Sequence, residues 1–128
     1  MPMIARTWRG TVRTPDAGHY AGYIRDTGFA EYGRTPGNRG AWLLRRDEAG
    51  TTEFLTLSLW DTVDAIRAFA GEDIDAAVLY PEDERYLIDG GADIRHFEVA
   101  DHIPDPAGEA AVTSCRARTR PAARASGR

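Results

Sequence analysis

The chain has 128 residues, of which 42% are hydrophobic and 28% charged, with a formal net charge of −4. This length and composition are typical of one globular domain and leave too little chain for two. No apolar run approaches the roughly 20 residues that a membrane-spanning helix needs, so we expect no membrane partner.

The charged residues are unevenly distributed. All sixteen basic residues are arginine, and residues 110–128 hold five of them and no acid, so the rest carries 11 arginines against 20 acids, a net charge of −9. Because an acidic domain repels phosphate backbones, we expect no nucleic-acid partner. We predict a domain over residues 1–101 and a disordered Arg- and Ala-rich tail over residues 102–128, since such a tail cannot bury much apolar surface.

The cellular location is predicted from the cysteine and the first residues. Cys115 is the only cysteine, so no internal disulfide can form, which fits a reducing compartment. The first six residues, MPMIAR, lack the apolar core of a signal peptide. We therefore expect a cytoplasmic location.

The first part of the chain predicts a strand, a helix and a loop. In the strand, about residues 3–12, apolar and polar side chains mix on both faces. Residues 14–16 supply a capping threonine, a proline for the first helical position and an acid for the first turn, so a helix follows. Glycines and other turn residues then predict a loop over residues 33–40.

The second part of the chain predicts two strands, helices and a last strand. The strands cover residues 41–47 and 53–60, with a hairpin turn between them. Asp61 is the predicted N-cap of a helix that ends near Gly71. We further expect a short helical piece over residues 73–79, a solvated turn at 82–84 and a last strand over 94–99. The order β-α-β-β-α-β predicts an α+β, ferredoxin-like fold with an antiparallel sheet.

Residues 54–69 are the most informative stretch, because their hydrophobic period changes from two to three or four. Leu55, Leu57 and Leu59 alternate with the mixed set Phe54, Thr56, Ser58 and Trp60. The helices of this fold cover one face of the sheet, so the leucines would be bare in a monomer, and we expect a homodimer. We expect the mixed face to form a pocket wall.

Five segments of the chain resemble the antibiotic biosynthesis monooxygenase family. They are IARTWRG (4–10), TPGNRGA (35–41), LSLWD (57–61), FAGED (69–73) and RHFEV (95–99). The resemblance covers about residues 3–100. It implies a dimeric α+β barrel in which two ferredoxin-like sheets face each other.

One branch of that family oxidises phenolic rings with O₂ and no cofactor. Its pattern places an Asn four residues before the strand-end Trp, a Tyr six residues after it and an Arg further on. Here Trp60 matches, whereas the other positions hold Thr56, Ile66 and, approximately, Tyr80. The leading interpretation is a monooxygenase or related tailoring enzyme that acts on a small aromatic, phenolic molecule and uses no cofactor.

A second branch of the family degrades haem. Its characteristic Asn, Trp and His correspond here to about Trp8, Phe69 and Leu79, and no histidine lies between His19 and His96. A haem-binding protein with non-standard ligation therefore stays as an alternative. A non-catalytic dimeric module that binds a small molecule is the other.

The candidate site combines indoles, hydroxyl groups and one imidazole. We predict Trp60 and His96 as catalytic residues, the imidazole acting as general base because it titrates near neutral pH. The predicted substrate contacts are Trp8, Thr56, Ser58, Trp60, Phe69 and Tyr80, with Tyr80 at the pocket mouth. The tryptophans could instead be ordinary core residues and His96 a hydrogen-bonded structural one. The three histidines lack metal-ligand spacing, so we predict no metal site.

Overall fold

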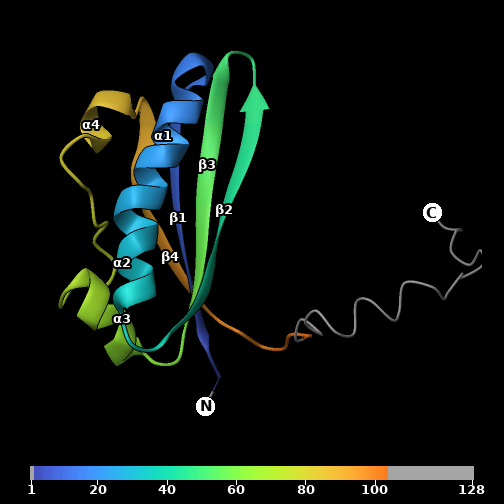
Figure 1. Cartoon of the computed structure of the whole chain (residues 1–128). Coiled ribbons are helices and arrows are strands. Elements are labelled where there is room, and N and C mark those ends of the chain that lie inside the picture. Colours follow the sequence, from blue (N-terminus) through green and yellow to red (C-terminus); the bar gives the residue numbers. More distant parts are fainter. Residues whose placement is uncertain (1, 104–128) are drawn as a thin grey trace, which may run out of the picture.

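The described chain, residues 2–103 of a computed structural model, forms a four-stranded antiparallel sheet in the order β2-β3-β1-β4 (Figure 1). The strands are β1 (Ile4–Arg13), β2 (Asn38–Glu48), β3 (Thr51–Trp60) and β4 (Asp89–Glu98). Helical segments connect β1 to β2 and β3 to β4, so the predicted ferredoxin-like α+β fold is confirmed. The predicted tail lies outside the described residues except for residues 102 and 103, and Cys115 lies outside them too.

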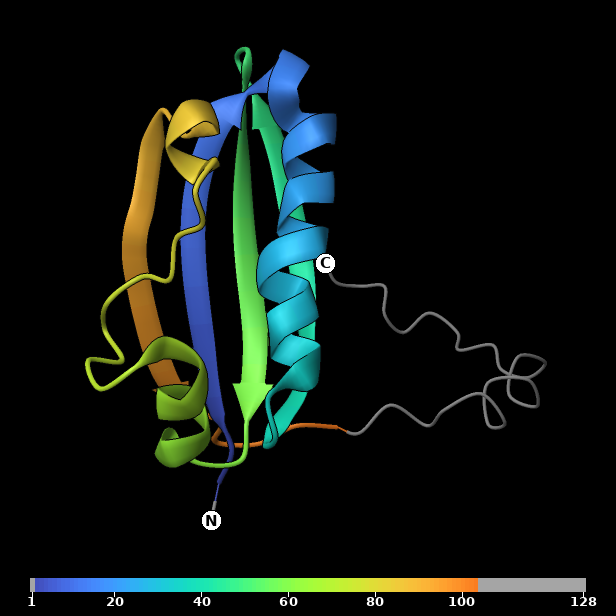
Figure 2. The same cartoon turned by 60° about the vertical axis from the view of Figure 1, so that its left-hand side comes forward.

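The first connection is helical along most of its length. A 3₁₀ turn (Thr14–Asp16) leads into α1 (Ala17–Ile24), a π-helical segment (Arg25–Phe29) and α2 (Ala30–Arg34), which lie in one line across the sheet (Figure 2). The residues of α1 and α2 that pack against the sheet are Ala17, Tyr20, Ile24 and Tyr32. None of the helices in residues 2–103 combines the length and the hydropathy that crossing a bilayer requires.

The second connection contains α3 (Val63–Ala70) and α4 (Asp83–Tyr86). The prediction that Asp61 caps α3 is wrong. Thr62 is the N-cap, with an extended backbone and a hydroxyl that accepts a 3.0 Å hydrogen bond from the amide of Ala65. The carboxylate of Asp61 instead pairs with Arg39 at 2.7 Å.

The predicted helical piece over residues 73–79 is also wrong, because residues 71–82 are irregular and run between α3 and α4 (Figure 2). The carbonyls of Ile74 and Ala76 accept hydrogen bonds from the side chain of Arg6 on β1. These long-range bonds replace bonds that a helix would form locally. We call residues 71–82 the 71–82 segment.

The strands β4 and β2 begin earlier than predicted, β4 by five residues and β2 by three. The start of β4 contains Gly90 and Gly91, which both have positive φ, a backbone conformation that glycine adopts readily. At Gly90 a Cβ atom would lie 2.8 Å from the carbonyl oxygen of Arg9, so a glycine lets β4 approach β1 there.

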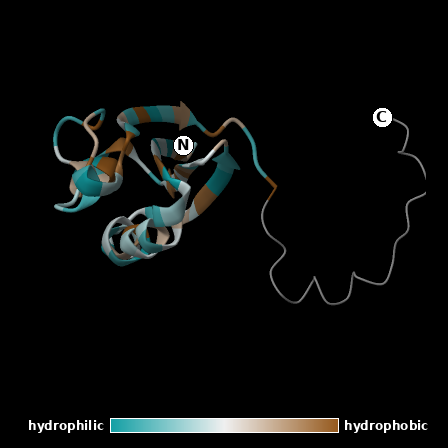
Figure 3. Cartoon of the chain, turned by 90° about the horizontal axis from the view of Figure 1, so that it is seen from above, coloured by the Kyte–Doolittle hydropathy of each residue, from teal (hydrophilic) through white to brown (hydrophobic). Residues whose placement is uncertain are grey.

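The two faces of the sheet differ as the alternation in β3 predicts. All helices lie on one side of the sheet (Figure 3). On that side the residues of β3 are buried, namely Thr52, Phe54, Thr56, Ser58 and Trp60. The other side carries six half-buried or exposed apolar residues, which we call the open-face patch: Trp42, Leu44, Leu55, Leu57, Leu59 and Phe97. No described element covers this patch.

Candidate functional site

A narrow pocket, partly open to solvent, lies between the sheet and the helical layer. Six aromatic rings contribute to its wall: Trp8, Tyr20, Phe29, Tyr32, Phe69 and Tyr80. The remaining lining residues are Arg6, Ile24, Thr27, Gly28, Thr56, Val78, Asp83 and Ile94. A mostly apolar cavity with a few polar groups is the usual form of a site for small molecules.

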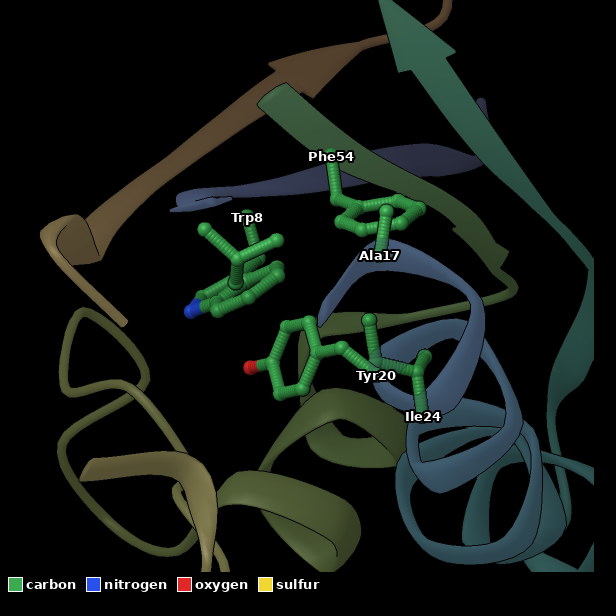
Figure 4. Close-up of a cluster of buried hydrophobic side chains, with 6 residues drawn as sticks. Trp8, Ala17, Tyr20, Ile24 and Phe54 are labelled. Carbon is green, nitrogen blue, oxygen red and sulfur yellow. The ribbon is translucent and has the colours of Figure 1, made fainter. Parts of the chain in front are cut away.

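The indole of Trp8 is fixed on the sheet side of the pocket. Its Nε1 donates a 2.8 Å hydrogen bond to the carbonyl oxygen of Gly91 on β4. A Cβ atom at Gly10 would lie only 2.6 Å from Trp8 Cη2, so the ring needs a glycine two residues further along β1. Figure 4 shows the indole beside the ring of Tyr20, within the cluster that joins β1 to α1.

A buried carboxylate holds two tyrosines at the wall. Asp83 Oδ1 accepts a 2.6 Å hydrogen bond from the hydroxyl of Tyr20, and Oδ2 accepts one of 2.6 Å from the amide of Tyr80. The expectation of a solvated turn at residues 82–84 is wrong for Asp83, which is 5% exposed. These bonds compensate for its burial. Burial, reinforced by Asp83, raises the pKa of Tyr20, so this hydroxyl stays protonated and acts as a donor.

The ring of Tyr80 lies in the pocket wall, and its hydroxyl donates a hydrogen bond to the carboxylate of Glu31 on α2. Burial raises the pKa of Tyr80, and the neighbouring Glu31 carboxylate adds to this. The bond connects the 71–82 segment to the helical layer. Tyr80 therefore helps to close the pocket on that side.

Trp60 lies one layer behind the pocket wall. It is fully buried, and its indole packs against Tyr32 and Phe69 with ring centroids 5.8 and 5.7 Å away. Its Nε1 donates a 2.9 Å hydrogen bond to Ser58 Oγ. Of the predicted substrate contacts, Trp8, Thr56, Phe69 and Tyr80 line the pocket, whereas Trp60 and Ser58 do not.

His96 lies next to the pocket, with Arg6 between them in the wall. Its Nε2 is 3.0 Å from Arg6 Nη1, and its Nδ1 is 3.3 Å from a carboxylate oxygen of Asp75. A guanidinium can only donate, so Nε2 is the acceptor and Nδ1 carries the proton. Burial and the charge of Arg6 lower the pKa of His96, which favours this neutral form. To act as a base through Nε2, His96 would first have to release Arg6.

Arg6 is the polar group that the sequence analysis missed. It is only 2% exposed and lines the pocket, with its guanidinium carbon 5.8 Å from the centre of the Phe69 ring. Burial lowers the pKa of this arginine. The one sequence signal was alternation, which places Arg6 on the same face of β1 as Trp8.

The pocket wall does not fit a haem held by the usual axial ligands. Its lining residues include no histidine, cysteine or methionine, and the hydroxyls of Tyr20 and Tyr80 are bonded to carboxylates. Within residues 2–103, no three His, Cys, Asp or Glu side chains are grouped so that they could hold a metal ion.

No protein-family model and no curated protein matches the chain. Solved structures do match it. A Bacillus cereus protein described as a candidate antibiotic biosynthesis monooxygenase has 15% identity and a TM-score of 0.60, covering 82% of this chain and 100% of its own. SnoaB from Streptomyces nogalater, a cofactor-independent oxygenase, has 16% identity and a TM-score of 0.56, with the same coverage.

The haem degrader MhuD from Mycobacterium tuberculosis is also similar, with 17% identity and a TM-score of 0.54 over 80% of this chain and 100% of its own. These similarities confirm the predicted fold. The chain has the fold of antibiotic biosynthesis monooxygenases, a fold that proteins of different activity share.

Proposed function

We propose that this protein is a cofactor-independent monooxygenase or a related tailoring enzyme that binds a small aromatic, phenolic molecule. The observation that carries the proposal is the pocket wall, in which six aromatic rings surround a space between sheet and helices. Aromatic side chains favour flat rings in offset or edge-to-face contact. SnoaB, which has the same fold, is a cofactor-independent oxygenase.

In the proposed reaction the substrate ring lies against Trp8 and Phe69 and loses a proton. The resulting phenolate or enolate is rich in electrons and reduces O₂ directly. A ring CH₂ group and O₂ then become a ring carbonyl and water, so the substrate supplies the electrons and O₂ is the oxidant. His96 stays the predicted base, acting through Nε2 once it has released Arg6.

An oxygen electrode tests this proposal. The purified full chain should consume O₂ when an anthrone is added and form the corresponding quinone. Binding of anthrones or naphthalenes without O₂ consumption would favour the non-catalytic binding module. A coloured protein with a haem spectrum would favour the haem alternative, and a chain that does neither would contradict the proposal.

The Phe69→Leu variant should bind a flat aromatic ligand about three- to tenfold more weakly than the native chain, because an aromatic pair contributes about 0.5–1.5 kcal/mol beyond its buried area. Leucine keeps the apolar bulk that packs on Trp60. Quenching of tryptophan fluorescence measures the affinity. The Phe97→Leu variant makes the same change on the open-face patch and should bind like the native chain.

The proposed function includes a homodimer in which a second copy covers the open-face patch. Trp42 and Phe97 are 51% and 49% exposed there, beside the half-buried leucines of β3. Burying apolar surface contributes about 25 cal/mol per Å². The family resemblance supports the same arrangement, with the two sheets face to face.

Two further proposals rest on sequence alone. One is the division into a domain (residues 1–101) and a disordered tail (residues 102–128), which the uneven distribution of arginine supports. The other is a cytoplasmic location, which the single cysteine supports. Cys115 and all of the proposed tail except residues 102 and 103 lie outside the described residues.

A further inference from the structure

The guanidinium of Arg6 has more hydrogen-bond donors than acceptors around it. Five N–H groups are available. Nη1 donates to the carbonyl of Ile74 at 2.5 Å and to His96 Nε2 at 3.0 Å, and Nη2 donates to the carbonyl of Ala76 at 3.2 Å. Within residues 2–103, Nε and one N–H of Nη2 therefore have no acceptor. Nε and Nη2 share an edge of the planar group, and this edge of a guanidinium matches the geometry of a carboxylate.

The charge of Arg6 is also poorly balanced. Its three acceptors are two carbonyls and a neutral imidazole, and Arg6 takes part in none of the ion pairs among the described residues. Asp75 contacts His96 rather than Arg6, and its side chain is 81% exposed. The contrast with Arg9 is clear. That residue, on the opposite face of β1, lies within 4 Å of Glu53, Asp89 and Asp93.

The surroundings of Arg6 would strengthen its pairing with an anion. Its neighbours in the pocket wall include Trp8, Phe69 and Ile94, and Arg6 itself is only 2% exposed, so its surroundings are mostly apolar. Opposite charges attract more strongly in such a medium than at an exposed surface. A ligand that carries an anionic group on a flat ring would therefore satisfy both the aromatic wall and the buried cation.

We propose that Arg6 is the specificity-determining residue of the pocket and selects an aromatic ligand that carries a ring-bound oxyanion, either a carboxylate or a phenolate. This inference rests on the proposed function, because it requires the pocket to bind aromatic molecules. The inference adds to the proposed function that the aromatic ligand carries a negative charge. For an oxygenase, the same contact would stabilise the phenolate from which electrons pass to O₂.

Two pairs of probes test the inference by calorimetry with the native full chain. The first pair is 2-naphthoate and neutral 2-naphthamide, and the second is 2,4-dinitro-1-naphtholate and its neutral methyl ether. In at least one pair the anion should bind about tenfold or more tightly than its neutral partner, because hydrogen bonds to charged groups exceed neutral ones by about that factor. The pair that shows the preference identifies the anion as carboxylate or phenolate.

Substitutions assign the preference to Arg6. The Arg6→Met variant should lose the anion preference, whereas Arg6→Lys should keep a reduced one, because it retains the charge without the planar guanidinium edge. Arg9→Met is the matched control on the opposite face of the same strand, and its preference should equal that of the native chain. Circular dichroism checks that each variant is folded.

A second measurement avoids the risk that Arg6→Met unfolds. In the native chain, the ¹H–¹⁵N NMR signal of Arg6 Nε, assigned by its loss in Arg6→Lys, should shift when the preferred anion is added. An unshifted signal, or an anion preference that persists in a folded Arg6→Met chain, would overturn the inference. Equal binding of anions and neutral partners would overturn it and leave the proposed function standing. If none of the four probes binds, both the inference on Arg6 and the proposed function are overturned.

Discussion

The Trp60→Ala variant is expected to lose about 3–5 kcal/mol of its free energy of unfolding, the usual cost of truncating a buried tryptophan. Trp60 is fully buried, and its indole contacts the rings of Tyr32 and Phe69 and donates a hydrogen bond to Ser58. Alanine would leave a cavity behind the pocket wall and remove the support for both rings. Urea unfolding followed by circular dichroism measures the loss.

The Trp60→Phe variant separates the two roles considered for Trp60. Phenylalanine keeps an aromatic ring in the core but removes the donor to Ser58, so a folded protein with a smaller loss of stability is expected. If Trp60 supports the wall without touching the ligand, Trp60→Phe should bind aromatic molecules almost as well as the native chain. Loss of binding in this folded variant would instead support the prediction that Trp60 contacts the substrate. A Trp60→Ala loss below about 1 kcal/mol would contradict the packing described here.

The Leu57→Asp variant is expected to convert the proposed homodimer into monomers or aggregates. Leu57 lies in the middle of the open-face patch, opposite Trp42 on β2 and Thr7 on β1. In a dimer that covers this patch, a carboxylate would be buried without a partner, which is strongly unfavourable. Sedimentation velocity at micromolar concentration measures the change.

The matched control for that experiment is Leu79→Asp. Leu79 is 52% exposed and belongs to the 71–82 segment rather than to the sheet. The same substitution there should leave the sedimentation coefficient unchanged. A native chain that sediments as a monomer at this concentration would contradict the dimer, whatever the variants do.

The fold could be predicted because its main signals are local. Alternation along residues 53–60 predicts both the strand and its two faces, and the change of period after Trp60 predicts the helix that follows. The start of α3 was predicted wrongly because two neighbouring residues are equally suitable as its N-cap. Asp61 and Thr62 are both suitable N-caps, and the choice of Thr62 depends on the backbone after β3.

The site was harder to predict because it depends on contacts between distant parts of the chain. Arg6 and Ile74 are 68 positions apart, and their hydrogen bond helps to keep the 71–82 segment out of a helix. Alternation places Thr56 and Trp60 on one face but does not give their depth, so it cannot tell that Thr56 reaches the pocket and Trp60 stays behind it. Arg6 is charged, so the sequence alone gives no sign that its side chain is buried on the inner face of β1.

The central claim is that the pocket between the sheet and the helical layer binds a flat aromatic molecule. The most direct test is isotope-filtered NMR of the full chain with 2-naphthoate, which detects protein protons close to the protons of the bound ring. We predict intermolecular contacts to Trp8, Phe69 and Ile94. Contacts to Leu57 and Trp42 on the open-face patch, or no contacts with a saturating ligand, would contradict the claim.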